Sequence, residues 1–247
     1  LELFKKLIHE EGVELWLTAL KPLDRGISPS EQSRLILSEG HPGLLAFVTN
    51  RGVRPWFLDG IELGTHIPKL LAEKNLSFSR RFLLTRILFS EDGYDKGRET
   101  LLEARLAVQK DPTARPIIEF KQGTLDTRSD ATYDFLLESY RLSDSPTLNT
   151  ILTAKLDYLA VNRMSELIRY FKSKLDPKKP IEERRRAADY LLEHPYLVLR
   201  GGNYHALLGQ LAADPDPELA KKGTENLQAL SAQDLIYHFP RSKDLDT

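Results

Sequence analysis

Histidine could bring metal or acid–base chemistry to this chain, because its imidazole ligates metals and titrates near neutral pH. The six histidines are His9, His41, His66, His194, His205 and His238. None belongs to an H-E-x-x-H or H-x-H motif, which would bring two imidazoles to one metal ion. Cysteine is absent, so thiolate ligands and disulfide bonds are excluded. We therefore expect surface or helix-end histidines, and neither a metal nor a cofactor.

A catalyst would need an activated nucleophile or a carboxyl group in apolar surroundings. The chain has no G-x-S-x-G nucleophile elbow. Among its carboxylates, Glu119 between Ile118 and Phe120 is a modest candidate. Arg200-Gly201-Gly202-Asn203 could present backbone amides to a phosphate, and a helix-linking turn explains these residues as well. We therefore predict no catalytic residue and a protein that is not an enzyme.

Arginine forms two clusters, and its planar guanidinium binds carboxylates and phosphates. Arg80, Arg81 and Arg86 fall between the apolar rows of the segment Phe78 to Phe89. This segment has the periodicity of a largely buried helix, in which a guanidinium has no apolar role. On the inner helix of a helical solenoid, arginines often face the concave surface, so this cluster could bind a partner.

The second cluster is Lys178, Lys179 and Arg184 to Arg186, five cations within nine residues. Such a patch could meet an acidic peptide, a phosphate or a nucleic acid. A solvated helix start also explains it, because Glu182-Glu183 would lie at the positive end of the helix dipole. Of the two interpretations, the solvated helix start is favoured.

The charge balance bears on the class of partner. The 247 residues include 35 basic and 36 acidic side chains, a net charge of −1. Nucleic-acid binding through overall charge needs a basic excess, so nucleic acid is disfavoured, although a local basic groove is not excluded. No apolar run approaches the ~20 residues of a membrane helix, and we expect no membrane span. The lack of cysteine fits a cytoplasmic protein, and the start at Leu1 suggests a fragment without its native N-terminus.

Helical periodicity dominates the chain, and strand signals are scarce. Asn149 to Lys174 has two apolar stripes offset around Val161-Asn162-Arg163, which predicts two helices with a tight junction. Leu44 to Val48 and Ile117 to Phe120 are the short runs that could form strands; Pro42 favours a helix for the first of them. Ser28 is the expected cap of a helix that starts near Pro29.

Two segments, Gly60 to Asp92 and Leu199 to Leu230, each contain a glycine-opened short helix, a polar turn and a longer amphipathic helix. In the first, Gly64 to Leu71 (GTHIPKLL) precedes Arg81 to Leu88 (RFLLTRIL). This segment resembles an armadillo repeat, and the second resembles one more loosely. Recurring helix pairs are typical of an α-solenoid, because each pair needs a neighbour to cover its apolar face.

In the armadillo family, the last helix of each repeat lines a concave groove. Nuclear-import members carry a tryptophan there and an asparagine four residues later. The matching positions hold Phe82 and Arg86 in the first segment, and Lys222 and Asn226 in the second. The resemblance thus implies a groove without specificity for nuclear-import signals. Separately, Ala232 to Arg241 resembles the short sequence segment that precedes the wedge domain in RecG-type helicases. This resemblance keeps a nucleic-acid interpretation open.

These patterns predict an all-α fold of about twelve to fourteen helices. We expect an armadillo/HEAT-like right-handed α-solenoid that forms a single domain over residues 1–247, with a hinge or an insertion at residues 176–180. The alternative is an irregular helical bundle, because Gly12, Gly40, Gly64 and Gly201 are unevenly spaced.

The predicted function is that of a non-enzymatic scaffold or regulatory domain that binds a partner protein in its concave groove. The alternative is a nucleic-acid-binding helical domain that uses the arginine clusters. The residues expected to contact the partner are Phe82, Arg86, Arg186 and Lys222. Phe82 could instead be a core residue, because Phe78 lies one turn below it.

Overall fold

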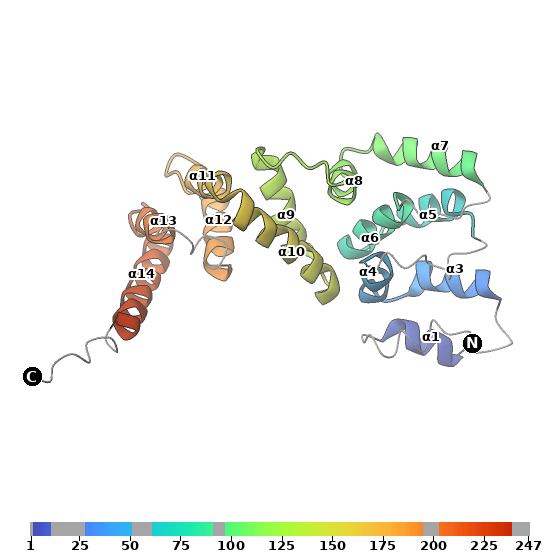
Figure 1. The fold of residues 1–247 in the computed structure, drawn as a ribbon, viewed down its shortest axis with the longest axis horizontal. Coiled ribbons are helices and arrows are strands. Elements are labelled where there is room, and N and C mark those ends of the chain that lie inside the picture. The colour runs from blue at the N-terminus through green and yellow to red at the C-terminus, as the bar shows by residue number, and fades with distance from the viewer. Residues whose placement is uncertain (1, 11–27, 51–60, 91–96, 195–202, 239–247) are drawn as a thin grey trace, which may run out of the picture. The chain divides into compact units, whose positions relative to one another are not determined.

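The computed structural model describes residues 2–10, 28–50, 61–90, 97–194 and 203–238 (Figure 1). In these residues every regular element is a helix: there are thirteen α-helices and no strand. The prediction of an all-α protein is confirmed, and the number of helices in the described residues lies in the expected range. Among the described helices, none combines the length and apolar character needed to cross a bilayer.

The chain divides into two compact units, Leu1–Lys155 and Leu156–Thr247, and their boundary falls inside one helix. The first unit contains α1 (Glu2–His9), α3 (Pro29–Glu39), α4 (Pro42–Asn50), α5 (Leu63–Leu71), α6 (Phe78–Leu88), α7 (Arg98–Gln109), α8 (Arg115–Gln122), α9 (Asp130–Leu142) and most of α10 (Pro146–Asn162). The second contains the end of α10, α11 (Met164–Lys174), α12 (Ile181–Glu193), α13 (Asn203–Ala212) and α14 (Pro217–His238). Residues 176–180 connect α11 to α12 within the second unit, and a hinge there stays a prediction.

The helices of the first unit pack in successive pairs. Within the pairs, α3 contacts α4, α5 contacts α6, and α7 contacts α8. Between the pairs, α5 contacts α7, α4 contacts α6, and α6 contacts α8 (Figure 1). Neighbouring pairs therefore cover one another's apolar faces. In the second unit, α11 contacts α12 and α13, and α13 packs against α14.

Helix α6 is the centre of the first unit, because it contacts α4, α5, α7, α8 and α9. Every residue from Phe82 to Leu88 is buried, including Thr85 and Arg86. A helix surrounded on most sides needs apolar residues around most of its circumference. The sequence of α6 meets this requirement except at its arginines and at the small polar residues Ser79 and Thr85.

Two glycines allow helices to approach closely. A Cβ atom on Gly64 of α5 would lie 2.4 Å from the backbone nitrogen of Leu101 in α7. A Cβ atom on Gly223 of α14 would lie 2.4 Å from the backbone nitrogen of Ala212 in α13. Because no side chain fits at these distances, both glycines are required by packing. Each segment that resembles a repeat contains one of them.

Several local predictions are confirmed. Ser28 caps α3, because its hydroxyl oxygen accepts a hydrogen bond from the backbone nitrogen of Glu31 at 3.3 Å. The run Leu44 to Val48 lies in helix α4, and α10 and α11 are separated by Arg163 alone. Ile117 to Phe120 lies in helix α8 and is not a strand. There, a proline in the first turn and Gly123 in a left-handed conformation (φ 71°) at the C-cap favour a short helix.

Candidate interaction sites

Phe82 is the centre of an aromatic cluster that α6, α8 and α9 build together. Its ring centroid lies 6.0 Å from Phe78, 5.6 Å from Phe120 and 6.1 Å from Phe135. Phe82 has no exposed surface, whereas the three surrounding rings are half-buried. Of the two roles that the sequence left open for Phe82, the structure shows the core role. The outer rings are the members of this cluster that reach the surface.

Arg86 follows Phe82 by one turn and is also buried, with 7% of its surface exposed. Its guanidinium lies over the ring of Phe120, 5.6 Å from the centroid. In the described part of the chain, Nε and Nη1 are buried and have no hydrogen-bond partner. Burial lowers the pKa of Arg86 to about 10, so the group remains charged at neutral pH.

The surroundings of Arg86 offset part of the cost of burying its charge. A fall in pKa from 12.5 to about 10 corresponds to roughly 3 kcal/mol. The contact with the Phe120 ring contributes about 0.5–2 kcal/mol. The position in the last turn of α6, where the helix dipole favours cations, contributes about 0.3–1 kcal/mol. Taken singly, both contributions are smaller than the cost, and neither supplies a hydrogen-bond acceptor for Nε or Nη1.

Two other arginines of the first unit have a clear structural role. Arg80 donates hydrogen bonds to the carbonyl oxygens of Gly40 (3.0 Å) and Leu37, at the C-terminal end of α3. Arg105 donates to the carbonyl oxygens of Leu88 and Ser90, both at 2.6 Å, at the end of α6. These guanidinium groups satisfy carbonyls that a helix end leaves unpaired. Arg86 forms no such bond with any residue that the structure describes.

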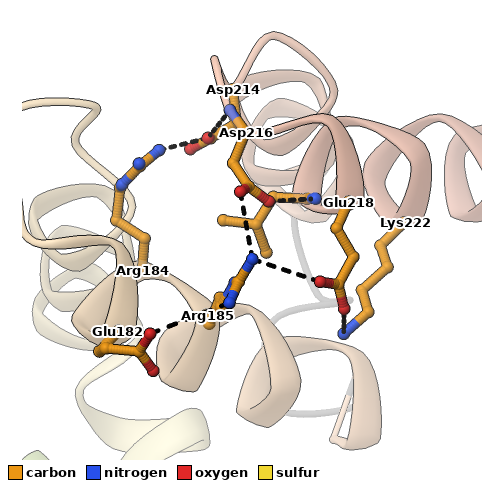
Figure 2. Close-up of polar contacts among 8 residues, drawn as sticks. Glu182, Arg184, Arg185, Asp214, Asp216, Glu218 and Lys222 are labelled. Atoms are coloured by element: carbon orange, nitrogen blue, oxygen red, sulfur yellow. Dashed lines mark hydrogen bonds and ion pairs between the residues drawn. The ribbon is translucent and has the colours of Figure 1, made fainter.

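In the second unit, Arg184 and Arg185 connect α12 to the turn between α13 and α14 (Figure 2). Arg184 is buried and forms an ion pair with the equally buried Asp214. Arg185 pairs with Asp216 at 3.2 Å and with Glu218 at 3.4 Å. The interpretation of this arginine run as a solvated helix start is therefore wrong for Arg184, because packing against the turn removes it from water.

The turn between α13 and α14 is itself ordered by its two aspartates. Asp214 accepts a hydrogen bond from the backbone nitrogen of Asp216 at 2.8 Å, and Asp216 accepts one from that of Leu219 at 3.1 Å. The bond from Leu219 lowers the pKa of Asp216, and Arg185 acts in the same direction. The turn thus presents two carboxylates to α12 while it caps the start of α14.

Arg186 and Lys222 are the predicted partner-binding residues of the second unit. Arg186 is exposed and forms no ion pair with any described residue. Lys222 is at the border of exposure; its Nζ lies 3.1 Å from Asp189 and 3.5 Å from Glu218. The hydrogen bond to Asp189 raises the pKa of Lys222. Partner binding by Lys222 would require exchange of these exposed ion pairs, which costs little.

The predicted site residues thus fall into two groups: Phe82 and Arg86 belong to the first unit, Arg186 and Lys222 to the second. One surface that joins all four stays a prediction. Glu119 is not a buried acid, because it lies partly exposed and accepts a hydrogen bond from Arg115 at 2.9 Å.

Some members of these sites were not found from the sequence. Phe120 and Phe135 lie in α8 and α9, far from Phe82 along the chain. Asp214 and Asp216 lie in the polar turn of the second segment that resembles a repeat, and the sequence alone does not pair them with arginines. Their position just before Pro217 is typical of the residues that cap a helix start, and this is the pattern from which their capping role could be predicted.

No protein-family model, no curated protein and no solved structure matches this chain. The armadillo resemblance therefore rests on the residues quoted for it.

Proposed function

We propose that this chain is a non-enzymatic protein-interaction domain built from an armadillo/HEAT-like right-handed superhelix of helix pairs. The packing of the first unit supports this proposal, because the second helices α4, α6 and α8 contact one another in succession and the first helices α5 and α7 contact each other. Stacked helix pairs form extended surfaces that bind other proteins.

The observation that carries the proposal is the buried guanidinium of Arg86 beside half-buried aromatic rings, because its Nε and Nη1 have no hydrogen-bond partner among the described residues. Arginine and aromatic residues dominate the binding energy of protein interfaces. A buried donor without an acceptor is costly, so an arrangement that lacks the acceptor favours a partner that supplies one. Arg186 and Lys222 would add polar contacts to such an interface.

The nucleic-acid alternative has less support. Within the described part of the second unit, Arg184, Arg185 and Lys222 are each paired with carboxylates. Lys179 also lies 3.9 Å from Glu183. Phosphate groups would have to compete with these acids for the same cations.

Affinity capture with the tagged full chain tests the proposal. Arg86→Met removes the charge and keeps an unbranched apolar side chain, whereas glutamate would bury a carboxylate among aromatic rings. We expect at least one protein that the wild-type chain retains to be lost more than tenfold with Arg86→Met, in a chain that remains helical by circular dichroism.

The matched control is Arg115→Met, because Arg115 is an exposed arginine of the same unit. This variant should retain the same protein. Equal retention by wild type and Arg86→Met would contradict the proposal. Retention of nucleic acid that falls steeply with salt would favour the alternative.

A further inference from the structure

We infer that Arg86 binds a carboxylate of the partner, presented next to an apolar side chain. This inference rests on the proposed function and names the chemistry that its surface recognises. The carboxylate is either an acidic side chain or the C-terminus of a chain. Both bring the same anionic group with two acceptor oxygens.

Two donors of Arg86 lack the acceptor that such a group would supply. In the described residues neither Nε nor Nη1 has an acceptor, and both are buried. The Phe120 ring occupies one face of the guanidinium, so its hydrogen bonds must form in the plane, at its edge. A carboxylate suits this edge, because it is planar and its two oxygens match the fork of the guanidinium.

The charge around Arg86 selects a monoanion. Burial is the cause that lowers its pKa, and no charge of a described residue adds to or offsets this shift. One carboxylate would neutralise the one guanidinium. A phosphate group carries about −1.5 to −2 at neutral pH and would leave excess negative charge beside the rings. A neutral carbonyl would accept a hydrogen bond but leave the buried positive charge uncompensated.

The aromatic rings favour an apolar group next to the carboxylate of the ligand. Phe78, Phe120 and Phe135 come from three helices and are each half-buried around Phe82. Their remaining surface can pack against an aromatic or aliphatic side chain of the ligand. The ligand therefore combines one negative charge with an adjacent apolar group.

A titration of the wild-type chain with four probes tests this inference. N-acetylphenylalanine carries a terminal carboxylate, and N-acetyl-Glu-Phe-amide carries a side-chain carboxylate. N-acetylphenylalanine amide is the neutral counterpart, and inorganic phosphate is the dianionic one. Binding is followed through the Nε–Hε nuclear magnetic resonance signal of Arg86, identified by its absence from Arg86→Met.

We expect at least one carboxylate probe to shift this signal at concentrations at least tenfold below those needed for the amide or for phosphate. The tighter of the two carboxylate probes identifies the source as a side chain or a terminus. Arg86→Met should lose the preference for carboxylate over amide, and Arg86→Lys should retain only part of it. The wild-type comparison needs no variant, so it holds even where a variant fails to fold.

Equal effects of amide and carboxylate, or tighter binding of phosphate, would overturn the inference. If capture of the partner depends on Arg86 in that case, the proposed function stands and this inference alone fails. If the carboxylate preference is found while capture is unaffected by Arg86→Met, Arg86 recognises carboxylates but the proposed function fails, and with it the assignment of that carboxylate to a partner protein.

Discussion

Arg86 in the first unit and Arg184 in the second are buried to nearly the same degree, with 7% and 6% of their surfaces exposed. Their electrostatic surroundings differ. The charge of Arg184 is paired with the buried carboxylate of Asp214, although Nε of Arg184 and Oδ2 of Asp214 have no hydrogen-bond partner among the described residues. The charge of Arg86 faces the Phe120 ring, and in the described part of the chain no acid is paired with it.

This difference shows that burial alone does not tell whether an arginine is paired with an acid. A buried ion pair couples two elements, and its removal leaves an uncompensated charge. A buried arginine without an acid gains nothing comparable from its own chain. The two sites should therefore respond to charge removal with opposite signs.

The largest effect is expected when the pair in the second unit is broken. Asp214→Asn keeps an acceptor for the backbone nitrogen of Asp216 but removes the charge opposite Arg184. We expect the free energy of unfolding to fall by about 3–5 kcal/mol, measured by urea denaturation. Adding Arg184→Met to this variant should restore at least half of the loss. A single-variant effect below about 1 kcal/mol would contradict the structural role of the pair.

A second substitution tests the helix packing next to this pair without touching either charge. Gly223→Ala would place a methyl group 2.4 Å from the backbone of Ala212, just before the turn that carries Asp214. Because backbone cannot yield as a side chain does, we expect a loss of about 1–3 kcal/mol in thermal or urea denaturation.

Gly209→Ala in α13 is the matched control for Gly223→Ala, since nothing lies within 4 Å of the new atom. It should raise stability by about 0.5–1 kcal/mol, because alanine has the higher helix propensity. If both alanine variants have the same effect, the close packing of α13 on α14 is not what limits Gly223.

In the first unit, removing a buried charge is expected to change the free energy of unfolding in the opposite direction. Arg86→Met should raise the free energy of unfolding by about 1–3 kcal/mol, because an uncompensated buried charge is replaced by an apolar side chain. Arg80→Met is the contrasting variant and should lower it by about 1–3 kcal/mol, because two helix-end carbonyls lose their donor. Destabilisation of Arg86→Met by more than about 1 kcal/mol would show that Arg86 has a structural role.

The sequence alone predicts those features of the fold that depend on residues close together in the chain. The cap at Ser28, the junction at Arg163 and the helix over Leu44 to Val48 follow from local composition, and the structure agrees. The guanidinium of Arg86 between apolar rows is also visible in the sequence. Its lack of an acceptor is not, because that depends on every element packed around α6.

Contacts between distant residues explain the remaining differences. Arg184 and Asp214 are 30 positions apart, so the sequence around Arg184 does not reveal its acidic partner. Two glutamates followed by three arginines therefore favour a solvated helix start. The armadillo resemblance assigns Phe82 to a groove position from its place along the helix. The resemblance does not determine how exposed that residue is, and here α8 and α9 cover Phe82.

The smallest effect is expected at Lys222, whose ion pair with Asp189 is largely exposed. Lys222→Met should lower stability by less than about 1 kcal/mol at pH 7, and about 1 M salt should remove most of the difference. The pKa of Lys222 is raised above 10.5 in the folded chain. The contribution of the pair is thus fully present below the unfolded pKa and is lost as the pH rises through the folded value. Urea denaturation of wild type and variant at pH 8 and above pH 11 should show the difference shrinking.

The loss in Asp214→Asn should persist in salt, because that pair is shielded from the solvent; equal salt sensitivity at both sites would contradict the distinction between them.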